Sequence, residues 1–429
     1  MNMMRDYPIS TLLVFGVLLR IIVLFFYQNI SIFPDSQGYL DLSELLLNFN
    51  FSGYDGTRSP GYPLLLSFAG GTLWIAVFFQ LLIGIASMVV LYKILLILKF
   101  NVKSALFLTI LMNSFLQVVF YEIAILTESL TLFVFLLIFM VLLHDYFEKK
   151  AVGTDLKMGF LLAFLVLIKP FYIFVPFIIY GFYILKKKPF LLFFSQKIIL
   201  LLFPMTVFLG WSAVNRINTG YFVPTTFYGF NIAQNCVSFA EKSPEKYKDI
   251  AAIYVKNREK MKANEEDIAM AIWSSYPELK AQTQLSFPDL SALLNEFSWA
   301  TIKQNPSDYW KQVFVSWSDF WRTAIYWNLD EFANKQSGSV FETIWHFQHY
   351  FLKLFKLLFL ANVVLLFIDF IRNRKWTSEI IITTIIIAAS ILQAFTTYGS
   401  NSRFSYPFEF LMIIVVLLQL KKMGFNRYL

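Results

Sequence analysis

The strongest constraint in this sequence is a series of long apolar blocks that are almost free of charge. The first runs from Thr11 to Tyr27 and contains one charged residue, Arg20. A helix needs about 17 to 25 mainly apolar residues to cross the hydrocarbon core of a bilayer, and blocks of this kind recur along the chain. The others are Leu73–Leu98, Ser104–Tyr121, Leu126–Leu143, Met158–Leu185, Ile198–Val214, Phe347–Ile371, Glu379–Tyr398 and Phe404–Leu420.

The overall composition agrees with these blocks. With 58% hydrophobic and 15% charged residues over 429 positions, the chain lacks the polar surface of a soluble domain. We therefore predict an all-α polytopic membrane protein. The first block has no small-residue cleavage site, so we expect a retained span and not a cleaved signal peptide. The single cysteine, Cys236, cannot form an intramolecular disulfide and is expected to be a small buried residue.

Basic residues gather in loops between some of these blocks, and the positive-inside rule places such loops in the cytoplasm. Both chain ends then lie inside. The net charge of +8 mainly reflects these anchors and does not indicate a nucleic-acid partner. The clusters are Lys99 and Lys103; Lys149, Lys150 and Lys157; Lys186, Lys187, Lys188 and Lys197; Arg372, Arg374 and Lys375; and Lys421, Lys422 and Arg427.

The block from Met158 to Leu185 has basic clusters on both sides, so it must cross the membrane an even number of times. Its 28 or so residues are too few for two full crossings. We predict two short helices broken at Lys169 and Pro170, because proline ends a helix at or before the residue that precedes it. Lys169 would then face an outer cavity, with snorkelling to the interface as the alternative. The chain would make about ten crossings or half-crossings.

The remaining loops face outward and divide the chain into three parts. Residues 1–214 form an N-terminal transmembrane module whose first extracytoplasmic loop is 28–72, and residues 346–429 form C-terminal transmembrane helices. Residues 215–345 are long enough for a small, mainly helical extracytoplasmic domain. We expect this domain to cover the outer cavity and to select the acceptor.

Ionisable residues recur at the outer ends of the spans, where each costs several kcal/mol and is a functional candidate by default. Together they predict a mixed-charge pocket at the level of the lipid head groups. Arginine and lysine there would bind a phosphate, and a carboxylate would accept a proton from an attacking group. The residues are Asp35, Asp41, Arg58, Glu122, Glu128, Lys169, Arg403 and Glu409.

Several segments at the outer ends of the apolar blocks recur in a characteristic order. They are "PDSQGYLDLSELLL" and "GTRSPGYPLLLSF" in the first loop, "LTESL" at 126–130, "LIKPFYIFVPF" at 167–177, "VNRINTGYFVPTTFYGFNIAQN" at 214–235 and "SNSRFSYPFEFLMI" at 400–413. Together these segments resemble the GT-C glycosyltransferases, in particular the protein O-mannosyltransferases and the bacterial aminoarabinose transferases. Arg20 in the first span fits the same pattern. The similarity covers most of the membrane part and fades between about Val237 and Trp345.

The resemblance implies a GT-C bundle of about ten transmembrane helices in a bacterial inner (plasma) membrane, with its active site facing the periplasm or cell exterior. It implies transfer of a sugar, with inversion, from a polyprenyl-phosphate donor to a lipid, glycan or protein acceptor. Asp35 is the expected catalytic carboxylate and Arg58 the expected donor-phosphate ligand. Lys169 and Arg403 are further phosphate ligands in this interpretation, and Glu128, Glu122 and Asp41 shape the pocket.

Each of these residues also has a structural interpretation. Asp35 follows Pro34 and is suited to cap a helix, and Arg58 is suited to anchor at the interface or pair with Asp55. Asp41 and Glu44 fit the polar face of an interfacial helix. Glu122 and Glu128 fit the first turn of a helix, where its dipole favours a carboxylate.

The first loop has "PDS" where the mannosyltransferases have paired acids, so no metal is assigned. A divalent cation is left open as a cofactor. His346 and His349 are three residues apart, but packing at the interface is the preferred interpretation. Two other functions compete. A glycan polymerase or ligase predicts essential outer arginines without an essential acid. A lipid-linked glycan transporter or flippase predicts internal repeats and a site at the bilayer midplane.

Overall fold

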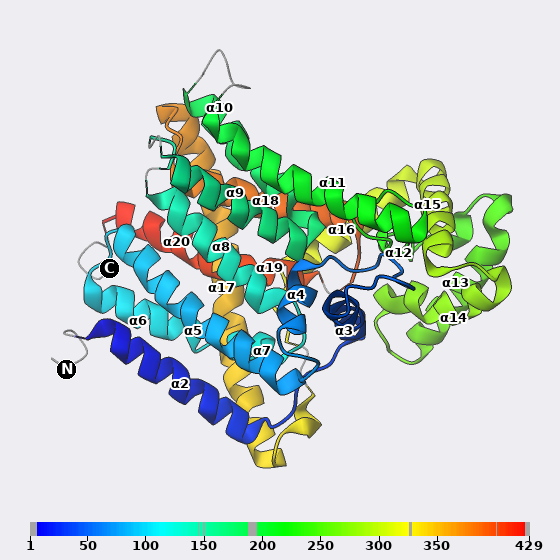
Figure 1. The fold of residues 1–429 in the computed structure, drawn as a ribbon, viewed down its shortest axis with the longest axis horizontal. Helices are drawn as coiled ribbons and strands as arrows, with labels where there is room; N and C mark the ends of the chain where they lie inside the picture. The colour runs from blue at the N-terminus through cyan, green and yellow to red at the C-terminus, as the bar shows by residue number, and fades with distance from the viewer. Residues whose placement is uncertain are drawn as a thin grey trace.

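The computed structural model describes residues 7–144, 146–148, 151–187, 195–325, 328–399 and 401–424, and these ranges contain helices and no strands (Figure 1). The α-helices are α2 (Pro8–Phe26), α3 (Pro34–Leu47), α4 (Gly61–Ser67), α5 (Leu73–Ile97), α6 (Val102–Asn113), α7 (Leu116–Ile123), α8 (Glu128–Leu143), α9 (Val152–Ile168), α10 (Phe174–Lys187), α11 (Ile199–Thr219), α12 (Tyr228–Gln234), α13 (Lys248–Ala263), α14 (Ala271–Thr283), α15 (Phe287–Gln304), α16 (Pro306–Phe320), α17 (Lys335–Asn373), α18 (Ser378–Thr396), α19 (Ser402–Ser405) and α20 (Glu409–Lys422).

Short 3₁₀ helices join these elements. They are η1 (Pro170–Ile173), η3 (Gln196–Ile198), η4 (Ala240–Lys242), η5 (Glu245–Tyr247), η6 (Ile268–Met270), η7 (Leu329–Glu331) and η8 (Tyr406–Phe408). Four residues of the expected cytoplasmic clusters lie outside the described residues, as does Ser400 of one quoted segment. The four are Lys149, Lys150, Lys188 and Arg427.

Seven helical segments within the described ranges are long and apolar enough to cross a membrane. The pair α6 and α7 counts as an eighth span if its 56° bend is included. Helices α8 and α9 are shorter, with 16 and 17 residues. The all-α polytopic prediction is therefore confirmed. The seven spans are Pro8–Phe26, Leu73–Ile97, Pro170–Lys187, Gln196–Thr219, Lys335–Asn373, Ser378–Thr396 and Ser402–Lys422.

The predicted break in the Met158–Leu185 block is present. Helix α9 ends at Ile168, Lys169 is extended with φ −142° and ψ 109°, and η1 and α10 follow from Pro170. Proline disfavours helical backbone in the residue before it, which explains the extended Lys169. The side chain of Lys169 is therefore presented at a chain reversal and not from the middle of a helix.

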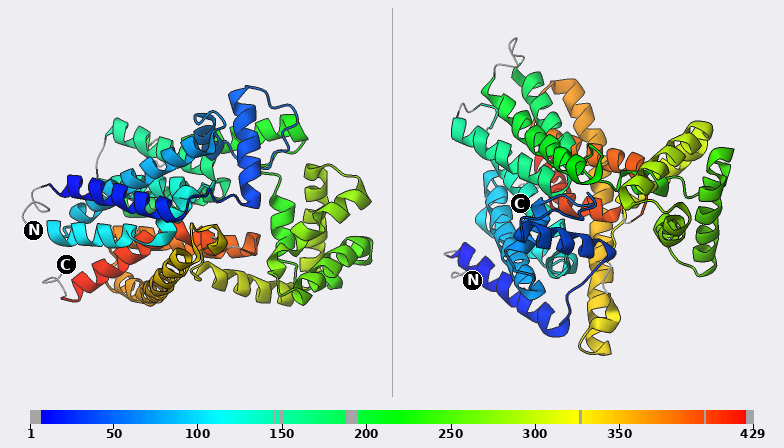
Figure 2. Two further views of the ribbon diagram at one scale, coloured as in Figure 1. Left: turned by 90° about the horizontal axis from the view of Figure 1, so that it is seen from below. Right: turned by 45° about the vertical axis from the view of Figure 1, so that its right-hand side comes forward.

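Two hydrophobic cores hold the molecule together. The larger is formed by the membrane helices, with Phe135, Phe139 and Ile386 fully buried. The smaller is formed by α12 to α16 around Leu290 and Phe297. This second group of helices, the lobe (residues 228–320), projects from one end of the bundle (Figures 1 and 2). Helix α16 packs on α18 and links the lobe to the bundle.

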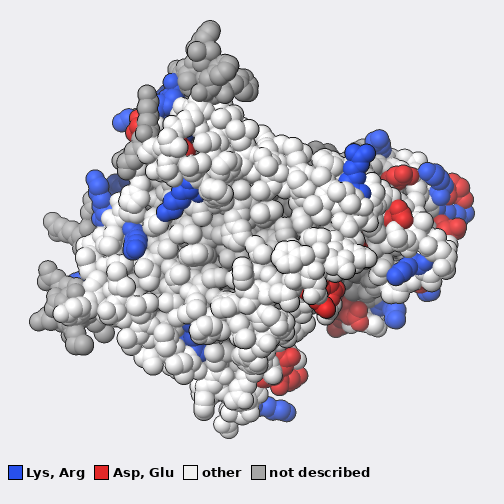
Figure 3. Space-filling view, in the orientation of Figure 1, with Lys and Arg blue, Asp and Glu red and all other residues white. Residues whose placement is uncertain are grey.

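Helix α17 runs without interruption from Lys335 to Asn373, a length of 39 residues. The expected boundary at residue 345 therefore falls inside this helix. Its first turns are polar, which is why hydropathy alone detects only the part from about Phe347. In the face shown in Figure 3, charged side chains gather on the lobe and at the opposite rim, and the surface between them is mostly uncharged.

Candidate functional site

A pocket of about 340 Å³ lies where the bundle meets the lobe. Its walls come from the start of α3, the loop before α4, the break after α9, the lobe and the start of α19. Five of the predicted site residues line it. They are Asp35, Arg58, Glu128, Lys169 and Arg403.

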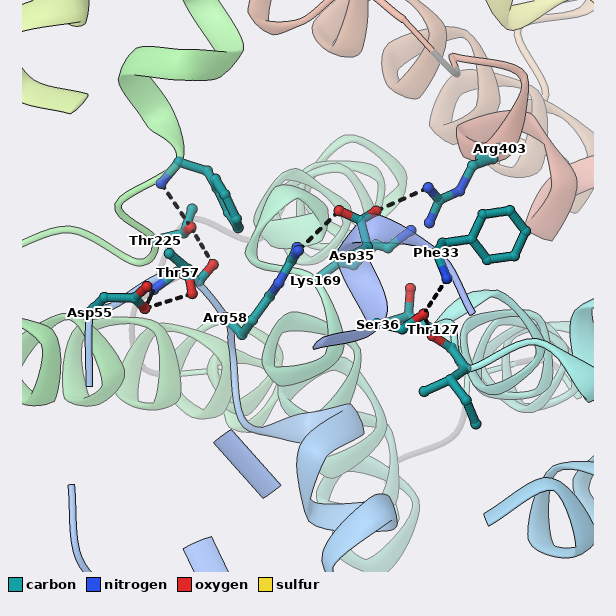
Figure 4. Close-up of polar contacts among 12 residues, drawn as sticks. Phe33, Asp35, Ser36, Asp55, Thr57, Arg58, Thr127, Lys169, Thr225 and Arg403 are labelled. Carbon is teal, nitrogen blue, oxygen red and sulfur yellow. Dashed lines mark hydrogen bonds and ion pairs between the residues drawn. The ribbon is translucent and has the colours of Figure 1, made fainter. Parts of the chain in front are cut away.

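The first turn of α3 presents Asp35 to the pocket (Figure 4). Pro34 occupies the first helical position, where proline is favoured. The Ser36 hydroxyl accepts the Phe33 N–H at 2.9 Å and donates to the Ile125 carbonyl at 2.9 Å. The residue before the helix is Phe33, so the carboxylate of Asp35 is not used as its cap and is available to the pocket.

Two arginines share the Asp35 carboxylate. Arg58 Nη2 donates to Oδ1 and Arg403 Nη1 donates to Oδ2, both at 2.9 Å. The Asp35 side chain is 37% exposed, against 12% for Arg58 and 16% for Arg403. Burial alone would raise the pKa of Asp35, but the two guanidinium groups of Arg403 and Arg58 hold it well below its ordinary value. Asp35 is therefore an ionised carboxylate in this state.

The second carboxylate, Glu128, is fully buried in the first turn of α8. Its Oε1 accepts Lys169 Nζ at 3.0 Å and lies 3.1 Å from Arg403 Nη2. Arg403 thus bridges the two acids. Lys169 Nζ also lies 5.3 Å from the centre of the Phe404 ring. Three cations face two carboxylates in this pocket, which leaves one net positive charge for an anionic ligand.

The loop before α4 holds Arg58 through its backbone. The indole N–H of Trp211 donates to the Arg58 carbonyl at 3.1 Å, and the Tyr54 hydroxyl also donates to it. Asp55 Oδ1 accepts the Thr57 N–H at 3.0 Å and the Thr57 hydroxyl at 2.7 Å, forming a turn of the type favoured by aspartate. Arg58 therefore does not pair with Asp55.

The guanidinium of Arg58 lies between two aromatic rings, 4.5 Å from the centre of Tyr39 and 4.4 Å from that of Phe227. Arginine stacks on such rings through its planar, weakly hydrated guanidinium. Arg58 Nε is buried and has no hydrogen-bond partner among the described residues. The stacking fixes the plane of the guanidinium.

Glu122 and Asp41 do not line the pocket. Glu122 is buried on α7 and forms two hydrogen bonds with Arg20, at 2.6 and 2.7 Å. Asp41 is exposed on α3 and accepts the Gln37 amide at 2.7 Å. Glu409 pairs with Lys356 at 2.8 Å in the bundle. Arg20 therefore pairs within the bundle and lies outside the pocket.

The sequence interpretation did not single out the neutral side chains that form the opposite wall. Asn231 and Gln234 come from α12, Trp273 from α14 and Thr397 from the end of α18. Neutral polar residues carry no charge signal in a sequence. Asn231 and Gln234 do fall within the quoted segment 214–235, which was the one available indication.

In the described part of the chain, no group of three or more histidine, cysteine, aspartate or glutamate side chains is gathered as a metal site. The two pocket acids already accept hydrogen bonds from Arg58, Lys169 and Arg403. His346 lies beside Glu342 at 3.9 Å on the exposed start of α17.

No protein-family model and no curated protein matches the sequence. Among solved structures, the chain is similar to the archaeal oligosaccharyltransferase AglB from Archaeoglobus fulgidus, in complex with an inhibitory peptide and a dolichol-phosphate. The match has 14% identity and a TM-score of 0.47, and it covers 99% of this chain and 51% of the other. This chain thus spans about half the length of that protein. Values this low assign no activity by themselves.

Proposed function

We propose that this protein is an integral membrane glycosyltransferase of the GT-C type that moves one sugar from a polyprenyl-phosphate donor to a hydroxyl or amine of a lipid, glycan or protein acceptor. The observation that carries the proposal is the shared carboxylate of Asp35, held by Arg58 and Arg403 in a pocket with one net positive charge. Such a site provides a phosphate clamp and a proton acceptor side by side.

The donor phosphate binds at Arg58, Arg403 and Lys169. Guanidinium groups bind phosphate oxygens through paired, charge-assisted hydrogen bonds. In the structure Asp35 and Glu128 accept hydrogen bonds from these donors, and an incoming phosphate competes with Asp35 for the two arginines. The prenyl chain remains in the bilayer, because the phosphate ligands lie at the ends of apolar helices.

Phosphate binding prepares Asp35 for catalysis. When the arginines turn to the phosphate, the half-buried Asp35 carboxylate loses the charges that lower its pKa and becomes a stronger base. Asp35 then takes the proton of the acceptor group as that group bonds to the anomeric carbon. The bond from this carbon to the phosphate oxygen breaks, and its electron pair leaves with the polyprenyl phosphate. Attack opposite the leaving group inverts the anomeric centre.

A reconstituted assay with a panel of polyprenyl-phosphate sugars tests this function. Asp35→Asn is expected to reduce transfer by roughly 10²- to 10⁴-fold, the usual contribution of a general base. Arg58→Ala is expected to reduce kcat/KM by roughly 10- to 150-fold, as for a lost hydrogen bond to a charged group. Asp41→Asn is the matched control, because Asp41 lies on the same helix and outside the pocket.

The outcomes separate the competing functions. Transfer at the wild-type rate by Asp35→Asn, combined with loss in Arg58→Ala, would favour a polymerase or ligase that needs no acid. Movement of labelled lipid across the bilayer with no sugar transferred would favour a transporter. Either result contradicts the proposal.

A further inference from the structure

Charged and uncharged polar side chains line different walls of the pocket. All five of its charged side chains come from the bundle and the first loop, whereas the wall formed by the lobe is uncharged. We call this wall the neutral wall. It comprises Asn231, Gln234, Met270 and Trp273 of the lobe, together with Thr225 and Phe227 from the segment directly before it.

Two amides on the neutral wall differ in how they are used. Gln234 Oε1 accepts the Thr397 hydroxyl at 2.8 Å, and its Nε2 donates to the Ala269 carbonyl at 3.2 Å. Gln234 therefore ties α12 to two neighbouring segments. Asn231 lies three residues earlier on the same helix face, and its amide has no hydrogen-bond partner among the described residues. It remains able to donate and accept toward the pocket.

An aromatic platform lies beside Asn231. The Trp273 ring stacks on Phe230 at 4.6 Å with a 14° angle, and its centre lies 5.4 Å from that of Phe227 with the two rings at 70°. Phe227 in turn packs against the Arg58 guanidinium. Arg58, Phe227 and Trp273 thus form a continuous surface that leads from the phosphate ligands to the neutral wall. A group bonded directly to the phosphate would lie on this surface.

We propose that the neutral wall binds the sugar ring of the donor and that this sugar is uncharged. This inference rests on the proposed function. The indole of Trp273 provides a flat apolar face for the C–H side of the ring, and the Asn231 amide pairs with ring hydroxyls. An amino sugar or a uronic acid would need a countercharge, which the described part of this wall lacks. The cavity lies at the small end of the range of about 300 to 1,000 Å³ for ligand pockets, which suits a monosaccharide.

Equilibrium binding without acceptor tests this assignment independently of turnover. The probes are a short-chain polyprenyl phosphate without sugar and the same lipid carrying a neutral hexose. Asn231→Ala is expected to weaken binding of the hexose-bearing lipid by roughly 3- to 10-fold, as for one neutral hydrogen bond. It should leave binding of the sugarless lipid unchanged. Equal effects on the two lipids, or unchanged binding of the hexose-bearing lipid, would overturn the inference.

Aromatic variants separate sugar contact from folding. Trp273→Phe keeps the stack on Phe230, and Trp273→Leu removes the flat face. Trp273→Leu is expected to weaken binding of the hexose-bearing lipid more than Trp273→Phe does. Trp299→Leu, at an exposed tryptophan of the same lobe, should change the affinity for neither lipid. If Trp273→Leu binds the hexose-bearing lipid and the sugarless lipid with unchanged affinities, the inference is also overturned.

A variant that changes which sugar is preferred gives the sharpest result. Asn231→Asp adds a carboxylate of nearly the same shape and is expected to favour a lipid that carries an amino sugar over one that carries a hexose. If the wild-type protein itself prefers the amino sugar or the uronic acid, the inference fails. Arg58→Ala serves as the separate test of the proposed function, because it should weaken both the hexose-bearing and the sugarless lipid. Unchanged affinity for both would contradict phosphate binding at Arg58 while leaving the Asn231 result readable.

Discussion

At the scale of single residues, the charge balance around Asp35 predicts the pH dependence of the reaction. Because Arg403 and Arg58 lower its pKa, the carboxylate of the free protein is protonated only well below its ordinary range. The profile of kcat/KM, which reports groups of the free enzyme, should therefore show no acid limb from Asp35 above about pH 5. Arg403→Gln removes one cation while burial remains, so Asp35 should titrate at higher pH and the acid limb should move upward.

Lys303→Gln is the control for this experiment, because Lys303 is an exposed cation on α15 of the lobe. It should leave the profile unchanged. An acid limb at the same pH in wild type and Arg403→Gln would mean that the activity does not depend on the ionised form of Asp35.

The residues of the pocket show which signals the sequence carries. Asp35, Arg58 and Lys169 were identifiable because a charge at the end of an apolar block is costly and needs a reason. The same criterion also selected Glu122. It could not reveal that the Glu122 carboxylate pairs with Arg20, about one hundred positions earlier in the chain. Asn231 carries no charge, so only the fold brings it to the pocket.

At the scale of elements, the close approach of α4 to α9 positions Arg58 relative to Lys169. A Cβ at Gly61, the first residue of α4, would lie 2.6 Å from the backbone of Leu167 and Ile168. Arg58 lies three residues before this contact, in the loop that leads directly into α4. Because the obstacle is backbone, it cannot give way as a flexible side chain could.

Gly61→Ala is therefore expected to separate α4 from α9, lower the thermal unfolding midpoint by several degrees and reduce sugar transfer. Gly181→Ala is the matched control. Gly181 is also helical, in α10, and a Cβ there meets no atom within 4 Å. Differential scanning calorimetry in detergent measures the unfolding midpoint, and the transfer assay measures the activity. A Gly61→Ala protein with wild-type midpoint and activity would show that the contact does not position the site.

The helix boundaries show a similar division between local and distant causes. The break at Lys169 was predictable because proline acts on its own neighbour. The start of α17 at Lys335 was not, because its first turns are polar and depend on contacts with distant segments, such as Phe332 and Phe341 packing on Tyr27 and Phe26. No local pattern in the sequence contains such contacts.

At the scale of the whole molecule, the basic clusters and the pocket lie at opposite ends of the same helices. Helix α9 runs from Val152, near Lys157, to Ile168 beside the pocket, and α10 returns to Lys186 and Lys187. Seventeen residues of helix span roughly 25 Å, close to the thickness of the hydrocarbon core of about 30 Å. Since the lobe forms one wall of the pocket, the side on which the lobe lies is also the side on which the proposed reaction would take place.

Thiol labelling of intact cells whose membrane holds the protein measures this orientation. Cys236 is the single cysteine and is buried, so a Cys236→Ser background removes the native thiol. Lys262→Cys, at an exposed site in the lobe, should react with a membrane-impermeant reagent applied to the intact cells. Lys103→Cys, at an exposed site in an expected cytoplasmic cluster, should react only after permeabilisation. The opposite pattern would place the pocket on the cytoplasmic side, and the donor sugar would then have to be supplied and transferred on the inner face of the membrane.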